Sequence, residues 1–482
     1  ILGACSRLAL LLLGLASGFP PSIPSKSLTP RYVARSQRSG KQRQPKRPHF
    51  RRRTVERSRL ALDVGLRQAF EAAAVTLDDD RRLAYRVHGS IPHVVVLPDS
   101  VEAVAAVVSL AHRHGMAVTP WGGGTHQTVG FPPRRVEVVL SLERLVSILS
   151  YEPDDLTVSA QSGTRVADLA ARLAFGRHML PLDVPIAGPS TVGGMVATSL
   201  GGPRAAHYGA CRDFLIGARV VLADGSTSTS GGMVVKNVTG YDLHKLHVGA
   251  LGSLGVVVEA NFKVIPIPAV DTTLVIRGCR VEPAFGLCAE LRRSALSPSA
   301  VTILGGRASR LGRGHAGTAY PTSEGSRPGE MIQPGEQGLV DLLIRCDERG
   351  EPVARHVREI GAMAGQLGIP GPEEIRRDEA AALWSRVVEF CHGSLEDDLG
   401  LGVVFRLSCL PSAALVLYLE LVQAAAAERL EWSIVGHVNQ ASLTLELRPG
   451  KGDANGAASL VQFCRRPASW WPAALCVWTQ SL

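Results

Sequence analysis

The sequence predicts an α+β protein with two successive domains, and three features of the 482-residue chain carry this prediction. Over residues 88–268, short runs of β-branched residues alternate with segments whose apolar residues recur at helical spacing. Glycine is dense between residues 183 and 256, which indicates turns or closely packed backbone. After Pro268, helical segments alternate with short strands in a second α+β arrangement.

The first domain follows a helical lead-in at residues 59–87. HVVVLP at 93–98 is predicted as a strand, and Asp99 or Ser100 as the cap of a helix that runs to Gly115. Further expected elements are a strand entering the glycine turn of 116–125, strands at 136–142, 156–163 and 215–222, an Asp-Gly hairpin turn after the last, and a helix at 166–174.

The second domain is expected over residues 269–450. A stretch rich in Gly, Pro and Ser at 312–338 is predicted to be a surface loop, and residues 451–482 show no clear period and are expected to be irregular. Helices are expected at 283–296, 352–368, 373–390 and 413–430, and strands at 272–278, 338–346, 400–408 and 442–449.

The positive charge of the chain belongs to its N-terminal tail. The whole chain has 52 Lys and Arg, 43 Asp and Glu, and a formal net charge of +9, but residues 1–59 hold 14 of the basic residues and only one acidic residue, Glu56. The charge balance of the folded part therefore argues against binding of nucleic acid by this protein. The nine cysteines are scattered singly without a CxxC pair, so no metal site is expected and a reducing compartment is favoured.

Residues 1–58 are predicted to be a disordered basic tail, and two origins stay open for it. The apolar run LALLLLGLA at 8–16 fits the core of a signal peptide and is too short to span a bilayer. Because Ile1 is no initiator and the first methionine is Met116, the interpretation as a fragment end or as spurious upstream sequence is favoured.

Three glycine-rich stretches are candidates for a ligand site. Gly122–Gly124 follow a predicted strand, and their unobstructed peptide N–H groups can form an anion-binding nest, although a surface turn would look similar. The pattern matches neither GxGxxG nor GK[ST], so the nicotinamide and P-loop fingerprints do not apply. Pro189–Gly194 and Gly249–Val256 supply two more glycine loops, the first with two hydroxyl residues. Together the three loops predict a large dinucleotide held mainly by backbone.

A family resemblance runs from GGGTH at 122–126 to VVVEANFKVIP at 256–266, and it includes YEPDDLTV, LPLDVP, GPSTVGGMVATSLGG and VVKNVTGYDLHKL. This part resembles the FAD-binding domain of the vanillyl-alcohol oxidase type, also called the PCMH type. Within that superfamily it is most similar to the FAD-binding E subunit of bacterial glycolate oxidase. The resemblance covers residues 88–268 well and the second domain loosely.

The resemblance implies a PCMH-type FAD-binding domain of two subdomains, followed by an α+β cap-like domain over the flavin ring. It places the pyrophosphate of a noncovalent FAD at Gly122–Thr125 and Ser190–Gly194, and the flavin and ribose along Ala197–Thr198 and Gly255–Val256. The expected cofactor-binding residues are Gly122, Gly123, Gly124, Thr125, Pro189, Ser190, Thr191, Val192, Gly193, Gly194, Ala197, Thr198, Gly252, Ser253, Gly255 and Val256.

Two polar features near these loops have competing interpretations. Some relatives attach FAD covalently to a histidine near this position, but Thr125 separates His126 from the glycines, so a locally hydrogen-bonded histidine is expected. The polar residues of VVKNVTGYD either orient the cofactor or a partner subunit, or form a buried hydrogen-bonded turn, which we favour because a buried lysine must pair. These residues are Lys236, Asn237, Tyr241 and Asp242.

Candidates for catalysis are weak, and no residue is assigned as the base. Arg204, His207, Tyr208 and Arg212 either attract a carboxylate substrate or are ordinary ion-paired residues. His437 stands where active relatives carry an HxGDGNxH-like segment, and the sequence GHVNQ lacks its Asp and its second His. A single histidine forms no metal site, and base catalysis requires a positioned partner. The ending WWPAALCVWTQSL also departs from the family pattern, which is consistent with truncation.

The resemblance implies the FAD-binding subunit of a glycolate-oxidase-like 2-hydroxy-acid dehydrogenase that works beside a D-type flavoprotein subunit and an iron–sulfur subunit. Such a complex is expected in the cytoplasm, at the inner face of the membrane through its partners. Two alternatives stay open: a self-sufficient FAD-linked oxidase of another alcohol or hydroxy acid, and a non-catalytic flavoprotein scaffold for electron transfer.

Overall fold

The structure is a computed structural model that describes residues 76–77, 82–127, 133–234, 240–312, 338–348, 350–375, 377–390, 402–450, 453, 455–464 and 476–480. The chain divides into a unit of residues 1–72, which lies outside the described residues, and a unit of residues 73–482. All that follows concerns the second unit. The predicted helical lead-in up to residue 75 and most of the predicted loop at 312–338 also lie outside the described residues.

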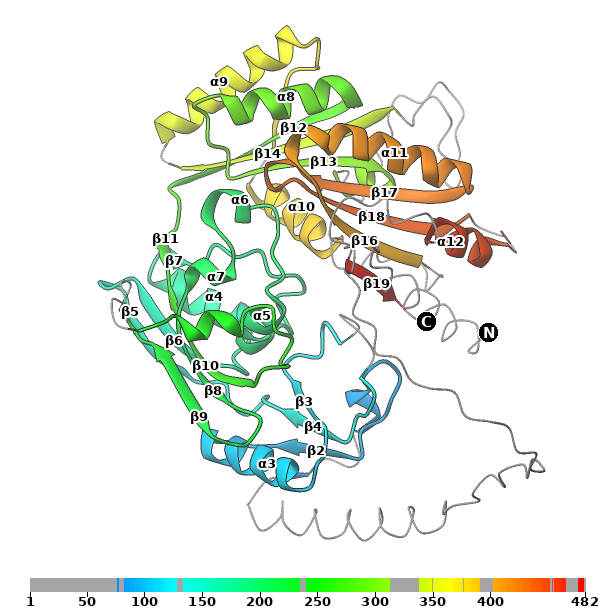
Figure 1. Cartoon of the computed structure of the whole chain (residues 1–482). Coiled ribbons are helices and arrows are strands. Elements are labelled where there is room, and N and C mark those ends of the chain that lie inside the picture. Colours follow the sequence, from blue (N-terminus) through cyan, green and yellow to red (C-terminus); the bar gives the residue numbers. More distant parts are fainter. Residues whose placement is uncertain are drawn as a thin grey trace, which may run out of the picture. The chain divides into compact units, whose positions relative to one another are not determined.

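The N-terminal sheet has three parallel strands and one antiparallel edge strand, in the order β1-β2-β4-β3. Helix α3 connects β2 to β3 (Figure 1). Ser100 caps this helix, since its side-chain oxygen accepts a hydrogen bond from the Ala103 N–H at 3.2 Å, which decides between the two predicted caps. The elements are β1 (Thr76–Leu77), η1 (Arg82–Tyr85), β2 (Val94–Leu97), α3 (Val101–Arg113), β3 (Val118–Trp121) and β4 (Val138–Ser141).

A second sheet is antiparallel throughout, in the order β5-β6-β10-β8-β9. Its core is formed by one face of β6, β8 and β10 together with the apolar sides of α4 and α5. The elements are β5 (Ile148–Glu152), β6 (Thr157–Gln161), α4 (Val166–Phe175), β7 (His178–Met179), α5 (Val192–Thr198), α6 (Ala205–Tyr208), α7 (Cys211–Phe214), β8 (Leu215–Val221), β9 (Thr227–Gly231), η2 (Leu243–Leu246), β10 (Val256–Lys263) and β11 (Ile265–Pro266).

The C-terminal part is built on an eight-stranded antiparallel sheet in the order β15-β12-β14-β13-β17-β18-β16-β19. Helices α8, α9, α11 and α12 cover one face, and α10 packs on the other (Figure 1). The elements are β12 (Val270–Arg280), α8 (Val281–Arg293), β13 (Ala300–Gly306), η3 (Arg307–Gly312), β14 (Leu339–Glu348), α9 (Gly350–Gln366), β15 (Glu373–Ile375), α10 (Arg377–Phe390), β16 (Gly402–Ser408), η4 (Pro411–Ala413), α11 (Ala414–Ala427), β17 (Leu430–His437), η5 (Val438–Gln440), β18 (Ser442–Pro449), α12 (Gly456–Cys464) and β19 (Cys476–Gln480).

The structure confirms the α+β class and corrects the prediction in three places. Residues 373–375, predicted as the start of a helix, pair with β12 as the strand β15, and the helix begins at Arg377. The stretch expected to be irregular at 451–482 contains α12, and β19 pairs with β16. Of the predicted glycine loop Pro189–Gly194, the residues from Val192 on belong to the short helix α5.

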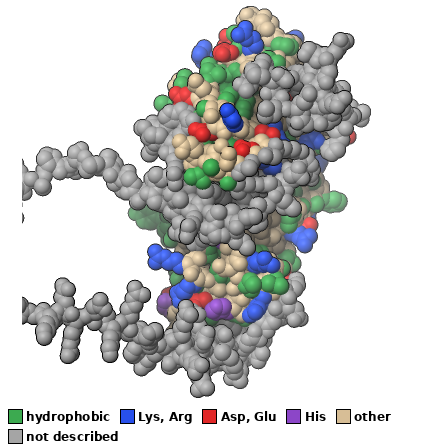
Figure 2. Space-filling view, turned by 90° about the vertical axis from the view of Figure 1, so that its right-hand side faces the viewer, with side chains coloured by type: hydrophobic (Ala, Val, Ile, Leu, Met, Phe, Trp, Pro, Cys, Tyr) green, Lys and Arg blue, Asp and Glu red, His purple; other side chains and the backbone are tan. Residues whose placement is uncertain are grey.

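No helix among the described residues is both long and apolar enough to cross a bilayer. On the face shown in Figure 2, the described basic, acidic and apolar side chains are interspersed. The search for clusters of three or more metal-ligating side chains found none within the described ranges.

Candidate functional site

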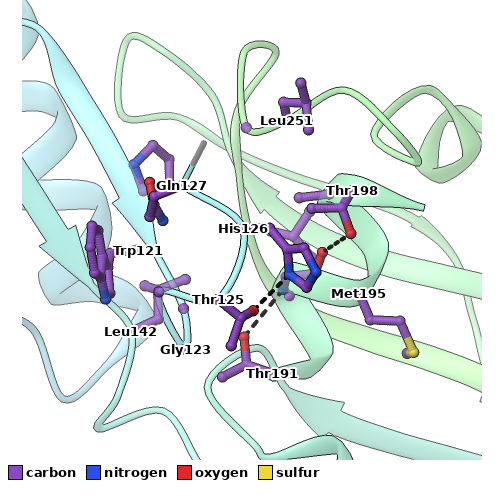
Figure 3. Close-up of a pocket in the computed structure, with 18 of the residues that line it drawn as sticks. Trp121, Gly123, Thr125, His126, Gln127, Leu142, Thr191, Met195, Thr198 and Leu251 are labelled. Carbon is purple, nitrogen blue, oxygen red and sulfur yellow. Dashed lines mark hydrogen bonds between the residues drawn. The ribbon is translucent and has the colours of Figure 1, made fainter. Parts of the chain in front are cut away.

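The three predicted glycine loops lie together around one pocket (Figure 3). The first loop follows β3, the second leads into α5, and the third lies between η2 and β10. We call this pocket the glycine cradle. The residues that line it are Val87, His88, Thr119–Gln127, Pro133, Leu142, Val184, Pro185, Ser190, Thr191, Gly193–Met195, Ala197, Thr198, His247, Ala250–Gly252 and Gly255–Val257.

Close packing of the first loop on the second explains why glycines are needed there. A Cβ atom at Gly123 would overlap the carbonyl group of Pro189, and one at Gly122 would overlap the hydroxyl of Thr191. Gly124 has a φ of +70°, in the left-handed region that favours glycine. The glycines therefore bring two backbone segments together and leave the wall of the cradle without side chains.

A hydrogen-bonded chain holds His126 in the cradle. The Ser190 hydroxyl donates to the Pro185 carbonyl at 2.9 Å, so toward Thr125, 3.3 Å away, it can only accept. The Thr125 hydroxyl in turn forms a hydrogen bond with His126 Nδ1 at 2.7 Å. Nδ1 of His126 is therefore engaged by this chain. Burial lowers the pKa of His126 to about 4.

Most of the residues predicted to bind the cofactor line the cradle, and three do not. Pro189 contributes its carbonyl group to the packing against Gly123, and Val192 is fully buried in the core of the second sheet. Ser253 turns its hydroxyl to the carbonyl of Ala250 at 2.6 Å. The lining residues are Gly122, Gly123, Gly124, Thr125, Ser190, Thr191, Gly193, Gly194, Ala197, Thr198, Gly252, Gly255 and Val256.

The comparison with known families covers two of the three loops of the cradle. A family model described as an FAD binding domain matches residues 92–231. Residues 92–231 are therefore similar to an FAD-binding domain. The bare backbone wall fits the group physically, since peptide N–H groups can face a pyrophosphate where no side chain intervenes.

Solved structures share the fold of this FAD-binding domain and of the sheet that follows it. p-Cresol methylhydroxylase matches with a TM-score of 0.65 at 16% identity, over 86% of this chain and 87% of that one. An alkyldihydroxyacetonephosphate synthase matches with a TM-score of 0.62 at 16% identity, over 83% and 78%. At this level of identity the likeness establishes the fold alone.

Curated relatives of the chain include proteins named for hydroxy-acid oxidation. The chain is 30% identical over 274 residues to glycolate oxidase subunit GlcD of Bacillus subtilis (57% of this chain, 55% of that protein). It is 34% identical over 275 residues to a D-lactate dehydrogenase of Archaeoglobus fulgidus (56% and 58%). It is 42% identical over 128 residues to glycolate oxidase subunit GlcE of Escherichia coli (26% and 37%). The chain thus spans about half the length, or less, of the relatives it matches.

Two histidines of the cradle were missed by the sequence analysis. His88 lines it from the loop before β2, and His247 from the segment that follows η2. Burial lowers the pKa of both. His247 directly precedes the third glycine stretch, so its position was a usable signal, whereas nothing in the sequence connected His88 with the glycine loops.

A second cavity, of about 480 Å³, lies between the FAD-binding domain and α10. Its apolar lining comes mainly from α4, β7 and α10, and one end holds two ion pairs. Arg204 Nε donates to Asp183 at 2.7 Å, and Arg345 Nε donates to Asp271 at 2.9 Å. The positive charge of Arg204 is therefore already paired, which favours the ion-paired interpretation of this residue over carboxylate attraction.

The carboxyl group of Asp347 lines the same cavity and is 4% exposed. Burial raises its pKa, against the opposite effect of the positive charge of Arg345, whose Nε lies 3.9 Å from the carboxylate. Burial and the charge of Asp347 in turn raise the pKa of Tyr208. A charged residue at the end of the apolar strand 339–348 was visible in the sequence, but its neighbours on other strands were not.

The remaining catalytic candidates, His207 and His437, contact different hydroxyl groups. His207 is exposed, and its Nδ1 lies 3.2 Å from the Ser297 hydroxyl. His437 is 3% exposed within β17, with Nδ1 3.1 Å from the Thr302 hydroxyl, and it lines neither of the two cavities. Burial, followed by the charge of Arg406, lowers the pKa of His437 to about 4.

The expected buried turn in VVKNVTGYD is wrong for the residues that the structure describes. Tyr241 is 88% exposed, and Asp242 is exposed and pairs with Lys245 at 2.9 Å. Lys236 and Asn237 lie outside the described residues. Arg212, predicted as a candidate cation, donates to the carbonyl of Lys245 at 2.9 Å.

Proposed function

We propose that the chain is the FAD-binding subunit of a glycolate-oxidase-like 2-hydroxy-acid dehydrogenase. The observation that carries the proposal is the glycine cradle in a chain whose relatives include glycolate oxidase, D-lactate and D-2-hydroxyglutarate dehydrogenases. The subunit assignment is supported by the 42% identity to GlcE over 128 residues, against 30% to GlcD over 274 residues.

The chain's own residues divide the work of holding such a cofactor. FAD bound in the cradle would supply the hydride acceptor for oxidation of a CH–OH group. The loops at Gly122–Thr125 and Ser190–Gly194 would bind its pyrophosphate, and Ala197–Thr198 and Gly255–Val256 would line its ribose and flavin. Gln440 joins the C-terminal sheet to the loop after α5, since its Nε2 donates to the carbonyls of Gly202 and Pro203 at 2.6 and 3.0 Å.

The proposed partners are a D-type flavoprotein subunit and an iron–sulfur subunit, with assembly in the cytoplasm at the inner face of the membrane. His437 supports dependence on partners, because it is sequestered from both cavities and supplies no exposed base. The test is anaerobic mixing of the FAD-loaded chain with glycolate or D-lactate. We expect no flavin bleaching by the chain alone and turnover once both partner subunits are added.

A self-sufficient FAD-linked oxidase or dehydrogenase is the second candidate. It is favoured by the alignments to GlcD and D-lactate dehydrogenase, which extend over 274 and 275 residues and so beyond the family match at 92–231. Bleaching of the isolated, FAD-loaded chain by either acid would establish this candidate and contradict the subunit proposal. If partners restore turnover even when this chain is flavin-free, the chain is a scaffold.

We further propose that FAD is held without a covalent bond. The support is the hydrogen-bonded position of His126, whose Nδ1 is engaged by Thr125. Acid precipitation of the loaded protein should release all the flavin to the supernatant. Flavin retained in the pellet would contradict this.

A further inference from the structure

The charge of the glycine cradle raises a question about cofactor binding. Among the described residues that line it, there is no Lys, Arg, Asp or Glu. Its ionisable side chains are three histidines: His88, His126 and His247. FAD, by contrast, brings a doubly negative pyrophosphate, whose transfer from water is costly unless it meets donors or positive charge.

The three imidazoles are neutral in the free protein near pH 7, because burial lowers the pKa of each. Burial is the whole cause of each shift, with no contribution from a charged neighbour.

The ionisable groups near these histidines are engaged elsewhere. Before His247, η2 carries Lys245, which pairs with Asp242 at 2.9 Å, and His244, which contacts the Ser230 hydroxyl. Before His88, Arg82 and Arg86 donate to backbone carbonyls. Around His126, the second loop and α5 present hydroxyl and apolar side chains (Figure 3).

An anion placed beside a neutral imidazole raises the pKa of that imidazole, because the charged form gains an opposite charge in a medium of low dielectric constant. The geometry around His126 allows this change. Its Nδ1 is hydrogen-bonded to the Thr125 hydroxyl, and this hydroxyl can accept from the protonated ring because Ser190 offers its proton an acceptor at 3.3 Å.

We propose that His88, His126 and His247 are cofactor-binding residues and that FAD enters the cradle with uptake of protons by these imidazoles. The proton comes from solvent, binds an imidazole nitrogen, and places a positive charge opposite the pyrophosphate. The inference rests on FAD binding and not on the substrate. The direction of the expected pH dependence follows from linkage. A group whose pKa is higher in the complex than in the free protein makes binding tighter as the pH falls between those two pKa values.

The test is calorimetric titration of the flavin-free full chain with FAD at pH 6.5, in two buffers of different ionisation enthalpy. We expect the observed enthalpy to differ between buffers in the sense of proton uptake. We also expect the dissociation constant to fall by roughly threefold to tenfold between pH 8 and pH 6.5, below the limit of about tenfold per pH unit for one proton. A buffer-independent enthalpy with a flat pH profile would overturn the proposal.

Variants assign the uptake to residues. His88→Asn, His126→Asn and His247→Asn are made singly and together, with His114→Asn as the matched control, since His114 ends α3 away from the cradle. The triple variant should bind FAD with a flat pH profile, and the control should behave as wild type. Full proton uptake in the triple variant would refute the assignment to histidines.

If the triple variant fails to fold, the single variants and the wild-type calorimetry still show whether these histidines take up the protons. FAD binding without proton uptake defeats this inference alone, whereas no FAD binding defeats the cofactor assignment itself.

Discussion

At the scale of single residues, the first two glycines of the cradle matter for their contact with the neighbouring loop. The sequence indicated a nest for phosphate, and the structure adds a second reason: Gly122 and Gly123 face Thr191 and Pro189 with no room for a side chain. A substitution there therefore acts on the protein before any ligand is present.

Gly123→Ala should lower the free energy of unfolding by about 1–3 kcal/mol, because its Cβ would overlap the backbone carbonyl of Pro189. It should weaken FAD binding as well, since the two loops must separate. Gly188→Ala is the matched control, because nothing lies within 4 Å of a Cβ at that position. Chemical denaturation of the flavin-free variants gives the comparison, and equal stability of the two would contradict the packing argument.

Asp183→Asn tests the ion pair at the end of the second cavity. The side chains of Asp183 and Arg204 are 7% and 14% exposed, so removing the negative charge leaves a nearly buried guanidinium unpaired. We expect a loss of about 3 kcal/mol in unfolding free energy. Glu102→Gln, which breaks a pair to Arg219 with Glu102 77% exposed, should change stability by less than about 1 kcal/mol. Similar losses in both variants would show that burial of the pair has no role.

At the scale of elements, the sequence predicted the helices and strands whose apolar residues recur with a clear period. Helix α3 and strands β2 and β4 appear where apolar spacing and Pro or Ser punctuation place them. The strands β13 and β17 were not predicted, and β15 was taken for helix. Each is defined by its pairing to a distant strand, which short-range periodicity does not encode.

The cap of α3 gives a prediction at this scale. Ser100→Ala should destabilise the protein by about 1 kcal/mol, because the Ala103 N–H loses its acceptor. Asp99→Ala, one residue earlier, should lower the stability by a few tenths of a kcal/mol at most, since Ser100 holds the cap position. Thermal unfolding of the two variants measures both losses. A larger loss for Asp99→Ala than for Ser100→Ala would mean that Asp99 is the cap in solution.

At the scale of the whole molecule, the C-terminal sheet buries a titratable group that makes stability depend on pH. The pKa of His437 is about 4 in the folded protein, against an ordinary value near 6.5 when unfolded. The unfolded state therefore binds more protons between these values, so the stability contributed at neutral pH is lost as pH falls from 6.5 toward 4. The loss is limited to about 3 kcal/mol for this residue.

His437→Asn should flatten that pH dependence relative to wild type. The other titratable groups are common to both proteins, so the difference between the two curves reports the effect of His437. Denaturant unfolding at pH 7 and pH 4.5 provides the measurement. Parallel curves would mean that His437 is already protonated, or equally accessible, in the folded state.

Sequence reasoning found the glycine loops that line the cradle and little of the second cavity. The glycine loops carry their signal in consecutive residues, so Gly122–Thr125 and Ser190–Gly194 could be found without a fold. The cavity's ion pairs join residues far apart in the chain, such as Arg345 with Asp271, and no local pattern connects them. His437 was singled out by its motif, and only the fold shows that it is sealed inside a sheet.

The central claim is that this chain binds FAD in the glycine cradle. The most direct measurement is equilibrium titration of the flavin-free wild type and of Gly123→Ala with FAD, followed by thermal unfolding at each concentration. The account predicts saturable binding by wild type, with about 2.7 kcal/mol of added stability at a hundredfold excess over the dissociation constant, and weaker binding by the variant. A wild-type protein that stays colourless and gains no stability at any FAD concentration would contradict it.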